Sequence, residues 1–110
     1  MKYLQILEIL QPSLKLTETE NRYLAFFLQE KENLDKVPEP HRSELLFSDK
    51  VRKKSKEILQ IKTSQANVLF SSLKKKGIIK QGDGGTYQLA GIFNAIDRET
   101  TEIVYKLSFT

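Results

Sequence analysis

The apolar residues of positions 47–89 are spaced in a way that few folds accommodate. After Leu59 they recur at intervals that suit a turn and then a second helix: Ile61, Ala66, Phe70 and Leu73. A helix-turn-helix needs an anchor at the end of its first helix, a plug in the turn and a stripe that seats the second helix. The segment therefore predicts two helices joined by a short turn.

The first of these helices begins near Asp49 and is amphipathic. Residues three or four apart share a helical face, and one such face holds Val51, Ser55, Ile58 and Leu59. We expect this face to be buried. The opposite side and its edges carry the charged residues, which are Lys50, Arg52, Lys53, Lys54, Lys56 and Glu57.

The second helix follows an interruption at Ile61-Lys62-Thr63-Ser64, where we expect Lys62 or Thr63 to be the N-cap. It closes on the lysines of positions 74–76, because cations in the last turn suit the helix dipole. Gly77 then provides a left-handed cap. Beyond it, residues 78–80 and 86–89 read as strands around a turn that contains Asp83-Gly84, which is a strong hairpin signal.

The region before this segment predicts one well-defined helix. Thr17-Glu18-Thr19-Glu20 matches a capping box, and the apolar face behind it runs to about Glu32. Because its aromatic residues coincide with the apolar stripe, we expect them in the core and not in a platform that stacks bases. Residues 33–42 contain two prolines and read as a loop. The apolar run of residues 45–47 is interpreted as a single short strand.

The two ends of the chain carry weaker patterns. Apolar residues of positions 3–10 favour a short helix that Pro12 stops, although a strand is also compatible with their partial alternation. Alternating apolar residues of positions 103–109 favour a final strand. We expect a single domain over residues 1–110, with an N-terminal helix in 1–13, a core in 14–91 and a strand extension in 92–110.

Residues 58–79, ILQIKTSQANVLFSSLKKKGII, resemble winged helix-turn-helix proteins of the MarR-like and replication-initiator-like kind, above all the small versions encoded by phages and plasmids. The resemblance covers about residues 14–91. It implies an α+β, mainly helical fold with three core helices, an N-terminal helix, a β-hairpin wing and a C-terminal strand. It also implies that the exposed side of the second helix enters the DNA major groove. By position, that side would carry Thr63, Ser64, Gln65, Asn67, Val68, Ser71 and Ser72.

This resemblance defines a predicted DNA-binding set. Gln65 and Asn67 each offer an amide that pairs with adenine, and the hydroxyls and cations offer phosphate contacts. The full set is Lys50, Arg52, Lys53, Lys54, Lys62, Thr63, Ser64, Gln65, Asn67, Ser71, Lys74 and Lys75. Two features depart from the family pattern: the second helix has no exposed arginine, and the wing carries Asp83, where a basic residue is usual.

The charge distribution favours a polyanionic partner. Residues 49–80 contain ten Lys or Arg and two acidic residues, a net charge of +8, whereas the whole chain carries +4. A basic half of this kind is typical of nucleic-acid binding, and a solvated lysine-rich face is the alternative. Like charges on one helix cost a few tenths of a kcal/mol per pair. Phosphate is the simplest partner that would compensate this cost.

No pattern in the chain indicates catalysis, and we expect no enzyme activity, cofactor or metal. There is no cysteine, no P-loop and no paired nucleophile and base, and the one histidine, His41, lies in a predicted loop without other metal-ligand residues at suitable spacing. The apolar runs are too short to cross a membrane, and the first residues do not resemble a signal peptide. We expect a cytoplasmic protein, in the host cytoplasm if a phage encodes it.

The sequence thus predicts a double-stranded DNA-binding protein that acts as a regulator or accessory factor in transcription or replication. The alternative is a non-enzymatic protein–protein adaptor or phage structural protein on the same fold, favoured by the neutral second helix, the acidic wing and the apolar C-terminal tail. An exposed edge strand in that tail would let another chain pair with it, so a homodimer or a protein partner is compatible with either reading.

Overall fold

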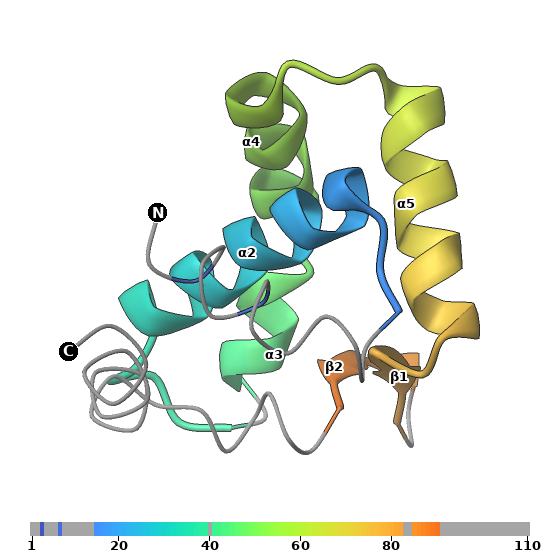
Figure 1. The fold of residues 1–110 in the computed structure, drawn as a ribbon. Coiled ribbons are helices and arrows are strands. Elements are labelled where there is room, and N and C mark those ends of the chain that lie inside the picture. Colours follow the sequence, from blue (N-terminus) through green and yellow to red (C-terminus); the bar gives the residue numbers. More distant parts are fainter. Residues whose placement is uncertain (1–2, 4–6, 8–14, 40, 83–84, 91–110) are drawn as a thin grey trace, which may run out of the picture.

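The computed structural model describes residues 3, 7, 15–39, 41–82 and 85–90 (Figure 1). Their elements follow the order α2 (Glu18–Asn33), α3 (His41–Leu46), α4 (Asp49–Leu59), α5 (Thr63–Lys75), β1 (Ile79–Gln81) and β2 (Tyr87–Leu89). In Figure 1, α2 crosses the middle of the molecule, α5 stands beside its N-terminal end, and the strands lie below α5. The predicted α+β, mainly helical class is confirmed for this part of the chain.

Helix α2 begins with the predicted capping box. The N–H of Glu20 donates to the hydroxyl of Thr17 over 3.2 Å, and the N–H of Thr17 donates to the carboxylate of Glu20 over 2.8 Å. These two bonds satisfy backbone donors that the first turn leaves free. Its aromatic residues lie in the core as expected, because Tyr23, Phe26 and Phe27 are each buried.

Helices α4 and α5 are joined by a turn of three residues. The hydroxyl of Ser48 caps α4, which ends where Gln60 adopts a left-handed backbone with φ of 55°. The N–H of Ile61 then returns to the carbonyl of Lys56 over 3.1 Å. Lys62 is the N-cap of α5, as one of the two predicted candidates, and its side chain makes no capping bond.

The buried side of α5 and the hairpin follow the predicted pattern. Ala66, Leu69, Phe70 and Leu73 are buried, and Gly77 has a positive φ of 77° after the helix. Strands β1 and β2 pair antiparallel, one residue later than predicted at the first strand. The Asp83-Gly84 pair itself lies outside the described residues.

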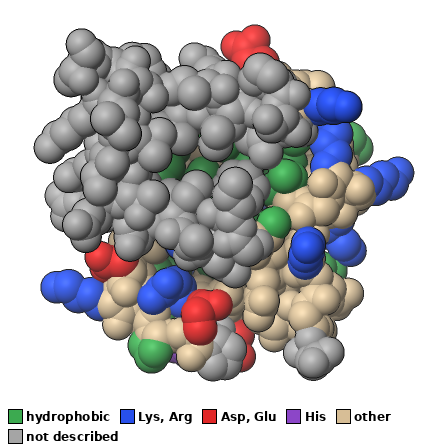
Figure 2. Space-filling model, turned by 60° about the horizontal axis from the view of Figure 1, so that its bottom comes forward, with side chains coloured by type: hydrophobic (Ala, Val, Ile, Leu, Met, Phe, Trp, Pro, Cys, Tyr) green, Lys and Arg blue, Asp and Glu red, His purple; other side chains and the backbone are tan. Residues whose placement is uncertain are grey.

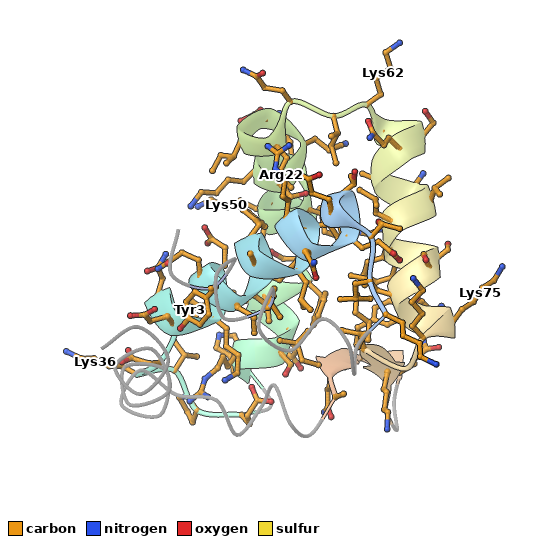
Figure 3. All side chains as sticks on the ribbon, in the orientation of Figure 1. Tyr3, Arg22, Lys36, Lys50, Lys62 and Lys75 are labelled. Atoms are coloured by element: carbon orange, nitrogen blue, oxygen red, sulfur yellow. The ribbon has the colours of Figure 1, made fainter. Side chains whose placement is uncertain are left out.

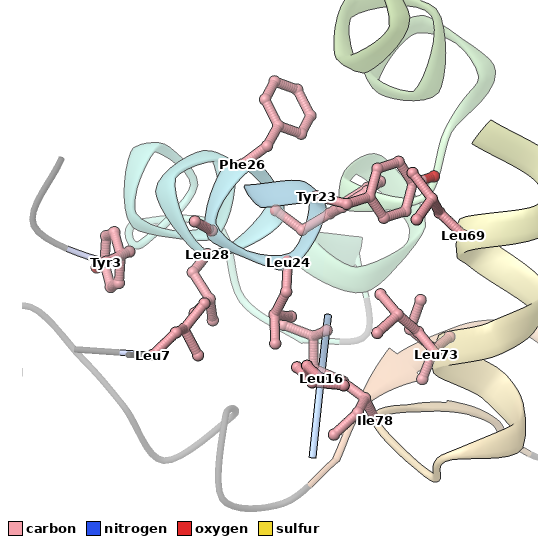
Figure 4. Packing of buried hydrophobic residues seen from close by; sticks show 14 of the residues in the cluster. Tyr3, Leu7, Leu16, Tyr23, Leu24, Phe26, Leu28, Leu69, Leu73 and Ile78 are labelled. Atoms are coloured by element: carbon pink, nitrogen blue, oxygen red, sulfur yellow. The ribbon is translucent and has the colours of Figure 1, made fainter. Parts of the chain in front are cut away.

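The core lies between α2, α5 and the hairpin. In Figure 4, Tyr23 of α2 lies beside Leu69 of α5, with Leu16, Leu73 and Ile78 grouped below them. Burying a large apolar side chain contributes about 1.5–3 kcal/mol. The packing of this group therefore holds α5 against α2, and with it the whole α4–turn–α5 unit.

An aromatic cluster extends this core to the short segment between α3 and α4. The ring of Phe47 lies 5.4 Å from Phe27, 6.2 Å from Phe70 and 6.3 Å from Tyr87, measured between ring centroids. The rings of Phe70 and Tyr87 are 5.0 Å apart in an edge-to-face arrangement. Phe47 therefore contacts α2, α5 and β2 at once.

The predicted strand at residues 45–47 is wrong, because this run belongs to the end of α3 and the residue after it. The side chain of Glu39 accepts from the N–H and the hydroxyl of Ser43, over 2.9 and 2.6 Å, and so supports the first turn of α3. The N–H of Phe47 continues the helical pattern to the carbonyl of Ser43. A run of three apolar residues is too short for its period to distinguish helix from strand.

The buried face predicted for α4 is correct except at Ile58. Ser55 is fully buried and Val51 and Leu59 pack against the core, but Ile58 is 53% exposed. Ile58 lies at the edge of the face defined by Ser55 and Leu59, so the helix turns it toward solvent.

Two residues of the predicted N-terminal helix are described, Tyr3 and Leu7, and both are helical and buried. The hydroxyl of Tyr3 donates to the carboxylate of Glu32 over 2.8 Å. The rest of residues 1–13 and the predicted final strand in 92–110 lie outside the described residues. Within the described part of the chain, no helix combines the length and the apolar character needed to cross a membrane.

Candidate nucleic-acid interface

A hollow of about 370 Å³ opens between α4 and α5, above the first turns of α2. Its polar and charged lining comprises Tyr23, Asp49, Arg52, Lys53, Lys56 and Asn67. Three of these side chains are cationic, and Asp49 is the one acidic residue among the described lining residues. We call this site the cationic hollow.

The helical repeat of α4 puts these residues on one flank. Asp49, Arg52, Lys53 and Lys56 are three or four positions apart, so their side chains project from the side of α4 that faces α5. The short turn at Gln60 brings the start of α5 against that flank. The Nζ of Lys56 accordingly donates to the hydroxyl of Thr63 over 3.2 Å.

Arg52 and Lys53 play different parts in the hollow. The guanidinium of Arg52 lies 4.5 Å from the centroid of the Phe70 ring, a cation–π contact that orients it. Lys53 is exposed and makes no hydrogen bond or ion pair with any described residue. One cation is therefore held in place, and its neighbour keeps a free ammonium group.

Tyr23 contributes its polar end to the hollow while its ring belongs to the core. The residue is 1% exposed, and burial raises the pKa of its hydroxyl, with the charge of Arg52 and a hydrogen bond with Ser55 acting in the opposite direction. The hydroxyl thus stays protonated at neutral pH.

The solvent side of α5 forms a second surface that adjoins the first. A shallow depression of about 410 Å³ is lined by Asn67, Val68, Ser71, Ser72 and Lys75. Asn67 lines both this depression and the cationic hollow. The two surfaces are therefore continuous.

The first turn of α5 extends the exposed surface that Asn67 and Val68 line. Thr63, Ser64 and Gln65 are exposed, as predicted, and Lys62 projects into solvent beyond them (Figure 3). Because no side chain caps this helix, its first backbone N–H groups are available to an anion.

Lys50 lies on the other flank of α4, away from α5 (Figure 3), and Lys54, one helical turn later, lies on the same flank. The Nζ of Lys54 pairs with the carboxylate of Glu30 over 2.7 Å, and both lysines line a separate hollow of about 270 Å³ that includes Glu30. The structure thus divides the basic residues of α4, which the sequence pattern had grouped together.

The C-terminal end of α5 carries a third group of cations. Lys74 lies 5.0 Å from the centroid of the Tyr87 ring, and Lys75 projects outward (Figure 3). In the view of Figure 2, several Lys and Arg side chains gather on the right-hand side, the side on which α5 lies in Figure 1. Lys74 and Lys75 lie about two helical turns beyond Asn67, the residue of α5 that lines the cationic hollow.

The side chains of Ser72 and Lys76 are bonded to α2. The hydroxyl of Ser72 donates to one carboxylate oxygen of Glu20 over 2.5 Å, and Lys76 donates to the other over 2.7 Å. Ser72, which was expected on the exposed side of the helix, is half-buried because this bond holds it against α2. Burial acts to raise the pKa of Glu20, but hydrogen bonds from Lys76, Ser72 and Thr17 outweigh it and lower the pKa from 4.5 to about 2.

The structure adds Tyr23 and Lys56 to the predicted set. Lys56 follows Arg52 by one helical turn, a signal present in the sequence. Tyr23 sits in an apolar stripe, and only the phenolic group distinguishes it from a core phenylalanine. Among the described residues, no cluster of His, Asp and Glu side chains is suited to hold a metal ion.

This chain matches no protein-family model, no curated protein and no solved structure.

Proposed function

We propose that this protein is a winged helix-turn-helix DNA-binding protein that holds duplex DNA through its phosphates. The observation that carries the proposal is the cationic hollow, in which Arg52, Lys53 and Lys56 converge beside the exposed face of α5. Phosphate contacts position a protein on DNA, and side chains on an adjoining helix then reach the bases.

The chemistry of the hollow suits a phosphate group. An oriented guanidinium forms paired hydrogen bonds to phosphate oxygens, and a lysine adds a mobile point charge. The uncapped backbone N–H groups at the start of α5 add neutral hydrogen-bond donors for phosphate oxygens. Neutralising phosphates releases counterions, which makes binding strongly dependent on salt.

The order of elements supports the winged helix-turn-helix assignment. A capped first helix, the six-residue α3, two helices joined by a three-residue turn, and an antiparallel hairpin directly after α5 follow one another along the described chain. In this arrangement α5 is the recognition helix and the hairpin is the wing. A regulator or accessory factor in transcription or replication is the role that such a protein performs.

The test is a titration of labelled duplex DNA over a range of salt. Replacing Lys53 and Lys56 by glutamine should lower the slope of log K against log[salt] by about 2, since each lost phosphate contact removes about 0.9. The matched control is Lys36→Gln with Lys50→Gln, which removes the same charge from sites remote from α5 (Figure 3). The control should keep the wild-type slope to within about 0.5.

Two results would contradict the proposal. An equal decrease of the salt slope in both double variants would mean that binding depends on the net charge of the protein and not on the cationic hollow. No binding at low salt would remove the DNA function and favour the protein–protein adaptor. Circular dichroism of each variant verifies that the fold is retained.

A further inference from the structure

Val68 is the most exposed large apolar residue of the described chain, at 67% exposure. The helical repeat places it at the centre of the solvent side of α5, opposite the buried stripe of Leu69, Phe70 and Leu73. Its neighbours one turn away are Ser64, Gln65, Ser71 and Ser72. The two methyl groups of Val68 line the depression on this side of α5, where they are open to contact from outside.

The residues around Val68 restrict which base pair this face can recognise. Helix α5 contains no arginine, aspartate or glutamate, and its lysines occupy the last turn, two turns beyond Val68. Guanine is read mainly by Arg or Lys, and cytosine by acidic acceptors. The central part of the face lacks both.

Thymine and adenine match what this face offers. The major groove exposes the thymine 5-methyl group, which apolar side chains contact, and adenine presents a donor and an acceptor that an asparagine amide satisfies together. Asn67 is exposed beside Val68, and both line the same depression. Building on the proposed DNA-binding function, we infer that α5 selects A·T pairs, with Val68 contacting a thymine methyl and Asn67 an adenine edge.

The thymine methyl provides a direct test, because uracil lacks only that group. Three duplexes of equal length are compared at one salt concentration: A·T pairs only, the same duplex with uracil replacing thymine, and G·C pairs only. Because the three duplexes carry the same number of phosphates, the contribution of phosphate contacts to binding is the same for each. Burying one methyl group is worth about 0.8 kcal/mol, so the wild-type protein should bind the thymine duplex about fourfold more tightly than the uracil duplex.

Two substitutions at the same position separate the methyl contact from other effects. Val68→Ser should bind the thymine and uracil duplexes equally, whereas Val68→Thr, which keeps one methyl group, should retain the preference. Asn67→Ala should reduce the preference for A·T over G·C by about fivefold or more, as one bidentate contact discriminates by about 1–3 kcal/mol. Because Val68 is exposed, these variants should melt at the wild-type temperature.

Each outcome distinguishes this inference from the proposed function. Wild-type protein that binds DNA but treats thymine and uracil alike overturns A·T selection by Val68 and leaves DNA binding in place. A uracil effect that persists in Val68→Ser also overturns it, because the methyl group would then act through duplex shape. Failure to bind any of the three duplexes overturns both.

Discussion

The carboxylate of Glu20 accepts hydrogen bonds from two parts of the chain that are far apart in sequence. It closes the capping box of α2 with Thr17, and it accepts from Ser72 and Lys76 at the end of α5. Lys76 also donates to the carbonyl of Lys15, the residue that begins the described segment before α2. One buried carboxylate therefore ties the start of α2 to the end of α5.

The lowered pKa of Glu20 predicts how the stability of the fold depends on pH. Its pKa is about 2 in the folded protein and near the ordinary 4.5 in the unfolded chain, so the ionised group stabilises the fold above pH 4.5. This contribution, about 3 kcal/mol, is lost as pH falls from 4.5 toward 2. We expect Glu20→Gln to remove most of the decrease in the free energy of unfolding between pH 4.5 and pH 2. Urea unfolding at a series of pH values from 2 to 7 measures this decrease.

Glu18→Gln is the matched control for this measurement. Glu18 lies in the same first turn of α2 but is exposed, so both variants change the helix dipole interaction by a similar amount. The control should keep the acid dependence of the wild-type protein. If Glu20→Gln and Glu18→Gln give parallel stability profiles, the bonds to Ser72 and Lys76 contribute nothing to stability.

At the scale of elements, the turn between α4 and α5 sets the geometry of the cationic hollow. It contains three residues, and Gln60 reverses the chain with a left-handed backbone. An L-residue with a Cβ pays about 1–2 kcal/mol for this conformation, which glycine adopts freely. The turn is therefore held by the packing of α4 and α5 against α2 and not by the preference of Gln60.

We expect Gln60→Gly to be more stable than Gln60→Ala by about 1 kcal/mol. Both substitutions remove the side-chain amide, but only glycine adopts the left-handed backbone without a steric cost. The gain over wild type should be about 0.5 kcal/mol, because glycine also raises the entropy of the unfolded chain. Thermal and urea unfolding measure both differences. An alanine variant as stable as the glycine variant would show that position 60 is not left-handed in solution.

At the scale of the whole molecule, Phe47 joins elements that are distant along the chain. Its ring contacts Phe27 of α2, Phe70 of α5 and Tyr87 of β2. Phe70 in turn lies beneath Arg52, so the same cluster orients a cation of the hollow. Packing at the centre of the fold and charge at the proposed interface are thus linked through one pair of rings.

Phe47→Ala should lower the free energy of unfolding by about 2–3 kcal/mol, less than for a fully buried phenylalanine because Phe47 is half-buried. Phe47→Leu retains most of the apolar volume and should lose less than half as much. Urea unfolding followed by circular dichroism gives both values. Equal losses in the two variants would mean that the aromatic contacts, and not the filled volume, stabilise this region.

The sequence alone was sufficient for features that depend on residues close together in the chain. The capping box at Thr17, the buried stripe of α5, the positive φ of Gly77 and the hairpin after it were all predictable. Each follows from a hydrogen bond, a helical repeat or a backbone preference that acts within a few residues. The same local rules failed at residues 45–47, where the apolar run was too short to show a period.

The packing of the helices, and no local pattern, determines which charged residues lie on the same surface. In the sequence, Lys50, Lys53 and Lys54 are equivalent members of one basic helix. In the folded protein, Lys53 lines the cationic hollow, whereas Lys54 forms an ion pair with Glu30. Likewise, no local pattern linked Ser72 to Glu20. A side chain's partner depends on how helices cross, which is set by contacts between residues far apart in the sequence. The spacing of apolar residues in positions 47–89 could therefore be interpreted from local patterns alone. The surface proposed to hold DNA is defined only by the packing of helices that are distant in the sequence.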